Sequence, residues 1–202
     1  MAPHMYESVV RKASASEAEA LADVIAEALY DDPPNVWAFP DPARRREILP
    51  RFFRLFVDDS IESGGAFALD DLAAVSLWFP PGWETSDKQV AEFEDAVREI
   101  AAEYAESGPL AIVKAMGEVQ PIDPHWHLAF VCTRPEKQGH GLGTALIRHV
   151  LERCDAEGHP VYLEATSERN RALYERLGFR VTSRIDLPDG PPMWGMWREG
   201  PP

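Results

Sequence analysis

The stretch QGHGLGTAL, residues 138–146, places a glycine at every second position, namely Gly139, Gly141 and Gly143. Glycine enters left-handed backbone conformations freely, so a glycine-rich loop can turn consecutive N–H groups toward a ligand. A helix that begins directly behind such a loop adds the positive end of its dipole, which favours an anion. The stretch therefore predicts either a phosphate-binding loop, with Thr144 adding a hydroxyl, or a tight strand-to-helix turn.

A dinucleotide-binding fold is one alternative for these glycines. A strand precedes them, a helix follows, and Glu164 ends the next strand about 20 residues on, where a ribose-binding acid would lie. However, the spacing is G-x-G-x-G, and residues 134–138 separate the strand from the first glycine. Too few residues follow to complete a doubly wound sheet. A nucleotide-dependent oxidoreductase is therefore the least favoured function.

Two motifs together resemble a known family. Residues 138–143, QGHGLG, match the Q/R-x-x-G-x-G/A signature of the GNAT family of N-acetyltransferases. The segment LEATSERNRALYERLGF, residues 163–179, is similar to the family's next strand and helix, with Asn170 and Tyr174 at familiar positions. The C-terminal PDGPPMWGMWR is similar to the tail of the puromycin N-acetyltransferase-like branch. Two motifs at the right separation are more specific than either alone.

The resemblance implies an α/β fold, with a mixed, mostly antiparallel sheet flanked by helices and a strand–glycine-loop–helix site for acyl-CoA. It implies one N-acetyltransferase domain over residues 1–202, with the acyl-CoA core at about 126–182. The donor would be acetyl-CoA, whose pantetheine arm pairs with a strand and whose pyrophosphate lies on the loop. The implied donor-binding residues are Val131, Cys132, Thr133, Gln138, Gly139, His140, Gly141, Leu142, Gly143, Thr144 and Asn170.

The expected reaction is acetyl transfer to a primary amine of a small molecule, by direct attack on the thioester. In this family Tyr174 would protonate the leaving thiolate, although a tyrosine beside Leu173 and Leu177 also fits a packed helix face. A lysine-like amine is almost fully protonated at neutral pH, so a base would help. Glu164 is our first choice, with His127 and Glu84 as alternatives. Without a base, the chain would be a non-catalytic acyl-CoA-binding sensor.

Aromatic residues close to loops are candidates for the walls of the acceptor pocket. We expect Trp78, with Glu84 and His127, to contact the substrate, and about half of the other loop-proximal aromatics to be ordinary packing. His125 and His127 share a strand face, but no third ligand accompanies them, so we expect no metal. The aromatic candidates are Trp37, Phe39, Trp78, Trp83 and Trp126.

The charge balance restricts the partners. The formal net charge is −14, which argues against binding to nucleic acid or to an anionic membrane. Residues 134–148 oppose this sign with a net positive charge, which suits a polyanionic ligand. The two cysteines give no disulfide framework, and no stretch approaches the roughly 18 apolar residues of a membrane span. We expect a cytoplasmic protein and leave a homodimer open.

Hydrophobic periodicity and turn residues predict the elements that position these motifs, with residues 110–125 ambiguous. Alternating strands and helices indicate an α/β protein with a hairpin at each end of the sheet. The expected strands are residues 8–12, 66–69, 73–79, 127–133, 161–165, 179–187 and 193–198. The first expected helix is capped by Ser14 or Ser16 and is broken by the DDPPN stretch at residues 31–35. The other expected helices are residues 43–61, 88–107, 141–157 and 169–177.

Overall fold

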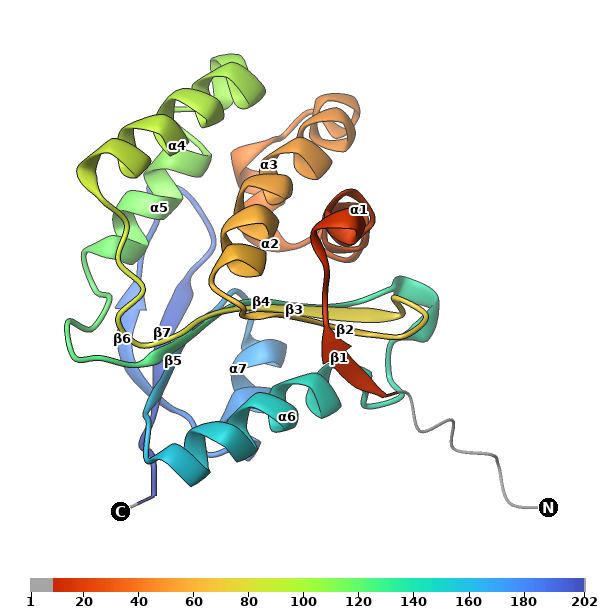
Figure 1. Ribbon diagram of the computed structural model, residues 1–202. Helices are drawn as coiled ribbons and strands as arrows, with labels where there is room; N and C mark the ends of the chain where they lie inside the picture. The colour runs from red at the N-terminus through yellow and green to blue at the C-terminus, as the bar shows by residue number, and fades with distance from the viewer. Residues whose placement is uncertain (1–8, 202) are drawn as a thin grey trace.

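A computed structural model describes residues 9–201 of the chain. A seven-stranded sheet divides the molecule, with α1 to α5 on one face and α6 and α7 on the other (Figure 1). The helices are α1 (Ala18–Ala28), α2 (Pro33–Ala38), α3 (Pro42–Glu62), α4 (Asp87–Ala101), α5 (Pro109–Gly117), α6 (Leu142–Glu157) and α7 (Glu168–Arg176). The strands are β1 (Val10–Lys12), β2 (Ala66–Leu69), β3 (Ala74–Phe79), β4 (Trp126–Thr133), β5 (Val161–Ala165), β6 (Arg180–Ile185) and β7 (Met193–Arg198).

The strand order is β1-β2-β3-β4-β5-β7-β6, and only β4 and β5 run parallel. This confirms the predicted mixed, mostly antiparallel sheet, with β2–β3 and β6–β7 as its hairpins. It also excludes the doubly wound parallel sheet that the dinucleotide-binding alternative requires. Residue 8, the expected start of the first strand, lies outside the described residues.

Two hydrophobic clusters lie on opposite faces of the sheet. On one face, Leu21 and Ile25 of α1 pack with Phe53 of α3, and all three are buried. On the other, Leu146 and Val150 of α6 are buried against the sheet. These are the helix faces that the 3.6-residue period predicts.

The region from residue 31 to residue 41 differs from the expected irregular break. Asp32 precedes a short helix, α2, whose first two residues are prolines. Proline fits the first turn of a helix because the N–H that it lacks would be unpaired there anyway. The ambiguous residues 110–125 form α5 followed by a loop. Both segments prove to surround the candidate site.

Candidate active site

The two parallel central strands, β4 and β5, separate partway along their length. β4 pairs with β5 only from Trp126 to Leu128, whereas it pairs with β3 as far as Thr133. The β3–β4 register shifts so that Ala129 has no partner, which is a β-bulge. The edge of β4 from Ala129 to Thr133 is therefore not covered by β5. An extended ligand could pair with this free edge as an added strand.

A cavity of about 180 Å³ lies at this separation, and we call it the inner cavity. Val131 lines it from β4 and Glu164 from β5, while Asn170 and Tyr174 line it from α7. Asn170 and Tyr174 share a helix face because they are four residues apart. The fold thus brings together four residues that the sequence assigned to donor binding and catalysis.

The glycine loop presents free N–H groups at the start of α6. Within residues 9–201, no backbone or side-chain acceptor pairs with the N–H groups from Gly139 to Thr144. Gly139 and Gly141 have φ of 80° and 79°, in the left-handed region. A Cβ on Gly143 would lie 3.4 Å from the hydroxyl of Thr133, so this glycine serves close packing on β4. Free N–H groups at the positive end of a helix form a site for an anion.

Two side chains of the loop hold its own backbone. The Gln138 amide donates to the carbonyl oxygen of Thr133 at 3.2 Å, and Nδ1 of His140 lies 2.9 Å from the carbonyl oxygen of Gln138. Leu142 packs against the α6 side of the core. These contacts give Gln138, His140 and Leu142 a part in shaping the loop, which leaves its N–H groups for the ligand.

Cys132 lies on the free part of β4, but its side chain points away from the loop into the core beneath α1 and α3. Burial raises the pKa of the thiol, and the nearby Asp32 carboxylate raises it further. The thiol therefore stays protonated and is unsuited to carrying an acyl group. Only the backbone of Cys132 is available at the strand edge.

Tyr174 is buried, with 7% of its surface exposed, and it faces the inner cavity. Burial raises the pKa of the phenol above its ordinary value, with smaller contributions from Cys132 and Asp32. The hydroxyl is therefore protonated throughout the physiological pH range. A phenol in this state can donate a proton to an anion that forms in the cavity.

Asp32 is a residue of the inner cavity that the sequence reasoning did not assign to the site. Its carboxylate accepts a hydrogen bond from the Thr166 hydroxyl at 3.1 Å, and the Asn170 amide donates to the same hydroxyl at 3.4 Å. Burial raises the pKa of Asp32 to about 6, although the bond from Thr166 opposes the change. The only sequence signal was an aspartate directly before the proline pair that begins α2.

Glu164 and His127 form a pair that links the inner cavity to a larger one. His127 Nε2 lies 2.8 Å from Glu164 Oε2, and the Glu164 side chain is only 3% exposed. His127 lines both cavities, whereas Glu164 lines only the inner one. A proton taken up from the larger cavity can therefore pass through the imidazole to a buried carboxylate.

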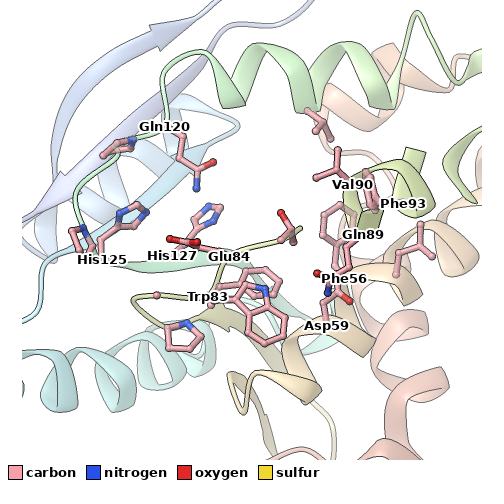
Figure 2. A pocket seen from close by; sticks show the side chains of 18 of the residues that line it. Phe56, Asp59, Trp83, Glu84, Gln89, Val90, Phe93, Gln120, His125 and His127 are labelled. Atoms are coloured by element: carbon pink, nitrogen blue, oxygen red, sulfur yellow. The ribbon is translucent and has the colours of Figure 1, made fainter. Parts of the chain in front are cut away.

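The larger cavity has a volume of about 690 Å³ and opens between α3, α4 and the loops 80–86 and 118–125; we call it the outer cavity. Gln120, His125 and His127 lie on one side, with Trp83 and Glu84 between them and the opposite wall (Figure 2). Phe56, Phe79, Val113 and His127 line both cavities, so the two adjoin. Figure 2 shows the opposite wall, which carries Phe56, Asp59, Gln89, Val90 and Phe93.

Trp78 does not form a wall of the acceptor pocket, which corrects the sequence-based expectation. It is fully buried on the α6 side of the sheet, and its indole N–H donates to the Ser76 hydroxyl at 3.1 Å. Phe79, the next residue, points to the opposite face and lines both cavities instead. Trp126 is also buried on the α6 side, whereas Phe39 and Trp83 do line a cavity.

Among residues 9–201, no group of three or more potential ligand side chains is arranged to hold a metal ion, and the absence of a bound metal remains a prediction. In the same part of the chain, no helix combines the length and the apolar character that crossing a membrane demands.

The chain matches the model of the acetyltransferase (GNAT) family over residues 72–179. It is 26% identical over 192 residues to an uncharacterized N-acetyltransferase of Schizosaccharomyces pombe, which covers 88% of this chain and 76% of the relative. Over 57 residues, 27% of this chain and 18% of the relative, it is 44% identical to the mycothiol acetyltransferase of Streptomyces coelicolor.

Solved structures share the whole architecture. An acetyltransferase from Corynebacterium glutamicum, described as histone acetyltransferase HPA2 and related acetyltransferase, superimposes with a TM-score of 0.66 at 27% identity, covering 96% of this chain and 97% of that one. The polyamine N-acetyltransferase of Drosophila melanogaster has the same TM-score at 19% identity, covering 95% and 99%. Since the family model spans more than half of the sequence and the fold agrees, the chain belongs to the acetyltransferase (GNAT) family.

Proposed function

We propose that the protein is an acetyl-CoA-dependent N-acetyltransferase that acetylates a primary amine of a small molecule by direct attack on the thioester. One observation carries this proposal: the free edge of β4 adjoins the unpartnered N–H groups of Gly139 to Thr144. The two adjoin because Gly143 packs against Val131 and Thr133. An extended arm followed by a diphosphate fits this combination of strand edge and anion site.

Acetyl-CoA would supply the activated thioester. Backbone N–H groups on the free β4 edge near Val131 would stabilise the charge that develops on the carbonyl oxygen, an effect typically worth about 10²–10³-fold in rate. Asn170 would contact the pantetheine arm from α7, and Tyr174 would protonate the departing sulfur. Both side chains line the inner cavity beside Val131, which supports these roles.

The acceptor would enter through the outer cavity, past His127 and Glu84. Glu164 would accept the amine's proton, with His127 as the relay between the two cavities, because Nε2 of His127 is hydrogen-bonded to the buried carboxylate. Asp32 is a second carboxylate of the inner cavity, on the Thr166 side. The attacking amine thus has a base within the cavity that it must enter.

The C-terminal tail and the cysteines bear on the acceptor and on the compartment. The C-terminal tail resembles that of the puromycin N-acetyltransferase-like branch, and Met193 of this tail lines the inner cavity, which supports a small acceptor. Residues 1–202 would form one catalytic domain, since strands from both ends of the described chain join one sheet. Two free, buried cysteines accord with a reducing compartment such as the cytoplasm.

The test is release of free thiol from acetyl-CoA in the presence of a panel of primary amines. We expect rapid, amine-dependent release with at least one class of small amine and formation of the corresponding N-acetyl product. If acetyl-CoA binds but no amine accelerates thiol release, the catalytic proposal is wrong and the acyl-CoA-sensor alternative replaces it.

A further inference from the structure

A row of residues crosses four strands on the face of the sheet opposite α6. His127 of β4 is in register with Tyr162 of β5, and Glu164, two residues further along β5, points to the same face. Across β7, Glu164 is in register with Gly195, which is in register with Ser183 of β6. The carboxylate that we propose as the base therefore has neighbours behind it as well as on the side of the cavities.

Gly195 has no side chain, and two hydroxyl groups fill the space beside it. A Cβ at Gly195 would collide with the hydroxyl oxygen of Ser183 and would lie 2.7 Å from that of Tyr162. Both oxygens are buried, and within residues 9–201 neither makes a hydrogen bond of ordinary geometry. A buried hydroxyl without a partner destabilises the fold, so its presence beside the proposed base needs an explanation.

Tyr162 has no access to a bound ligand. Its side chain is fully buried and lines neither cavity, and its ring lies against the imidazole of His127 with the centroids 5.6 Å apart. Any effect of the phenol on the reaction must therefore pass through a neighbouring side chain.

Glu164 is the neighbour on which the phenol can act. His127 engages Oε2 of Glu164 at 2.8 Å, and a carboxylate can accept hydrogen bonds at both of its oxygens. Burial raises the pKa of Tyr162, and Glu164 raises it further through its charge and its attraction for the hydroxyl proton, while the Ser183 hydroxyl opposes the change. The phenol therefore stays protonated and remains a donor beside the buried carboxylate.

We propose that Tyr162 is a positioning residue for the base: its hydroxyl donates to Glu164, which keeps the carboxylate ionised and turned toward His127. This inference rests on the proposed function, in which Glu164 accepts the proton of the amine. Burial of a carboxylate favours its neutral form, whereas a donated hydrogen bond favours the charged form. Tyr162 thus offsets the effect of burial on the base.

Several other titratable groups face Glu164, and all of them remain in the variant Tyr162→Phe. A difference in pH dependence between the variant and the unsubstituted protein therefore isolates the phenol hydroxyl. These groups are His127 of β4, His125 just before β4, Asp32 just before α2 and Tyr174 of α7.

The test is the pH dependence of kcat and KM in Tyr162→Phe, with an amine that the unsubstituted protein acetylates. We expect kcat to fall by about tenfold or more at the acidic end of the profile, because the carboxylate loses a donor that favours its charged form. The deficit should shrink as the pH rises, since the carboxylate then ionises without this donor. The KM for acetyl-CoA should change less than about twofold.

The matched control is Tyr104→Phe, which removes a phenol hydroxyl from a residue that lines neither cavity and should leave the profile unchanged. Circular dichroism checks the fold of both variants. A loss of kcat in Tyr162→Phe that is equal at every pH would indicate a purely structural role and overturn the inference. Unchanged kcat at every pH would overturn it as well, and either result leaves the acetyltransferase in place.

A measurement without turnover separates the inference from the proposed function. If no amine is acetylated, the proposed function fails, and ¹³C NMR of the protein with ¹³Cζ-labelled tyrosine decides whether the phenol donates to Glu164. The Tyr162 signal, identified by its loss in Tyr162→Phe, should shift in Glu164→Gln, because an amide oxygen is a weaker acceptor than a carboxylate. The Tyr104 signal should not move. A Tyr162 signal that is the same in both proteins would refute the hydrogen bond and the inference with it.

Discussion

At the scale of single residues, burial sets the protonation states in the inner cavity. Tyr174 and Cys132 both have raised pKa values, chiefly through desolvation, so both remain neutral beside Asp32. Of the two, only the tyrosine side chain lines the cavity. The environment thus supplies a protonated donor at the place where the proposed reaction forms a thiolate.

Tyr174→Phe should lower kcat by about 10²-fold or more while changing the affinity for acetyl-CoA by less than about threefold, because it removes a proton donor and little contact area. The matched control is Tyr104→Phe, since Tyr104 lines neither cavity. Single-turnover thiol release and acetyl-CoA titration measure the two quantities. Unchanged kcat would remove Tyr174 as the acid.

Asp32→Asn should make the protein more stable at neutral pH. Folding raises the pKa of Asp32 from 3.8 to about 6, so folding favours its protonated form. That stabilisation is complete below about pH 4 and is lost as the pH rises through about 6, costing at most about 3 kcal/mol relative to a neutral side chain.

The measurement for Asp32 is urea unfolding of both proteins at several pH values. The difference in unfolding free energy between Asp32→Asn and the unsubstituted protein should be near zero at about pH 4 and should grow to about 2–3 kcal/mol by about pH 8. A difference that does not depend on pH would show that Asp32 titrates normally.

At the scale of elements, the glycine loop works through backbone conformation. Gly139 and Gly141 occupy the left-handed region, with open space where a Cβ would lie. A side chain at either position would therefore be disfavoured by the positive φ and would obstruct the approach of the proposed ligand. Gly143 has an ordinary φ and packs on β4. The proposed donor site thus combines a conformational requirement with a packing requirement along one short stretch.

Gly141→Val should weaken coenzyme A binding by at least about tenfold with the fold retained, because valine disfavours the left-handed conformation and its side chain occupies the approach of the diphosphate. Gly117→Val is the control: it makes the same change at a glycine that also has open space but no positive φ. Calorimetric titration measures the affinity, and circular dichroism checks the fold. Undiminished affinity in Gly141→Val would place the diphosphate elsewhere.

At the scale of the whole molecule, the net charge of −14 coexists with a site for a polyanion. The positive charge near the loop is smaller than the sequence suggests, since Arg134 forms an ion pair with Glu27 at 2.8 Å. Free N–H groups therefore carry much of the expected attraction for phosphate. The outer cavity, through which the acceptor is proposed to enter, is lined by carboxylates such as Asp59 and Glu84 and by no lysine or arginine. The proposed donor and acceptor ends of the site thus differ in electrostatic character.

Acetyl-CoA should raise the melting temperature of the protein, whereas NAD and NADP should not. A ligand at about 100 times its Kd stabilises the folded state by about 2.7 kcal/mol. The mostly antiparallel sheet offers no second nucleotide-binding half. A thermal-shift series at matched concentrations measures this. A shift with NAD or NADP and none with acetyl-CoA would reverse the order of the functions proposed for this chain.

The sequence alone determined the features that depend on residues close together in the chain. The glycine spacing, the loop-to-helix junction and most helices and strands follow from short-range periodicity and turn chemistry, which the structure confirms. The sequence led to one wrong prediction, that Trp78 lines the acceptor pocket. Trp78 and the adjacent Phe79 point to opposite faces of the sheet, and the bulge opposite them lies in β4, far along the chain. Their own sequence therefore did not show which of the two lines the cavity.

Only the tertiary structure decided which residues join the site besides the glycine loop at residues 138–143 and the segment at residues 163–179. Thr166 lies 134 residues from Asp32 in the chain yet donates a hydrogen bond to it, and His127 is 37 residues from Glu164. The outer cavity likewise joins α3, α4 and two loops. Contacts of this range arise when elements pack around one sheet, and no local pattern records them. The contact between His127 and Glu164 and the set of residues that line the outer cavity are therefore properties of the fold.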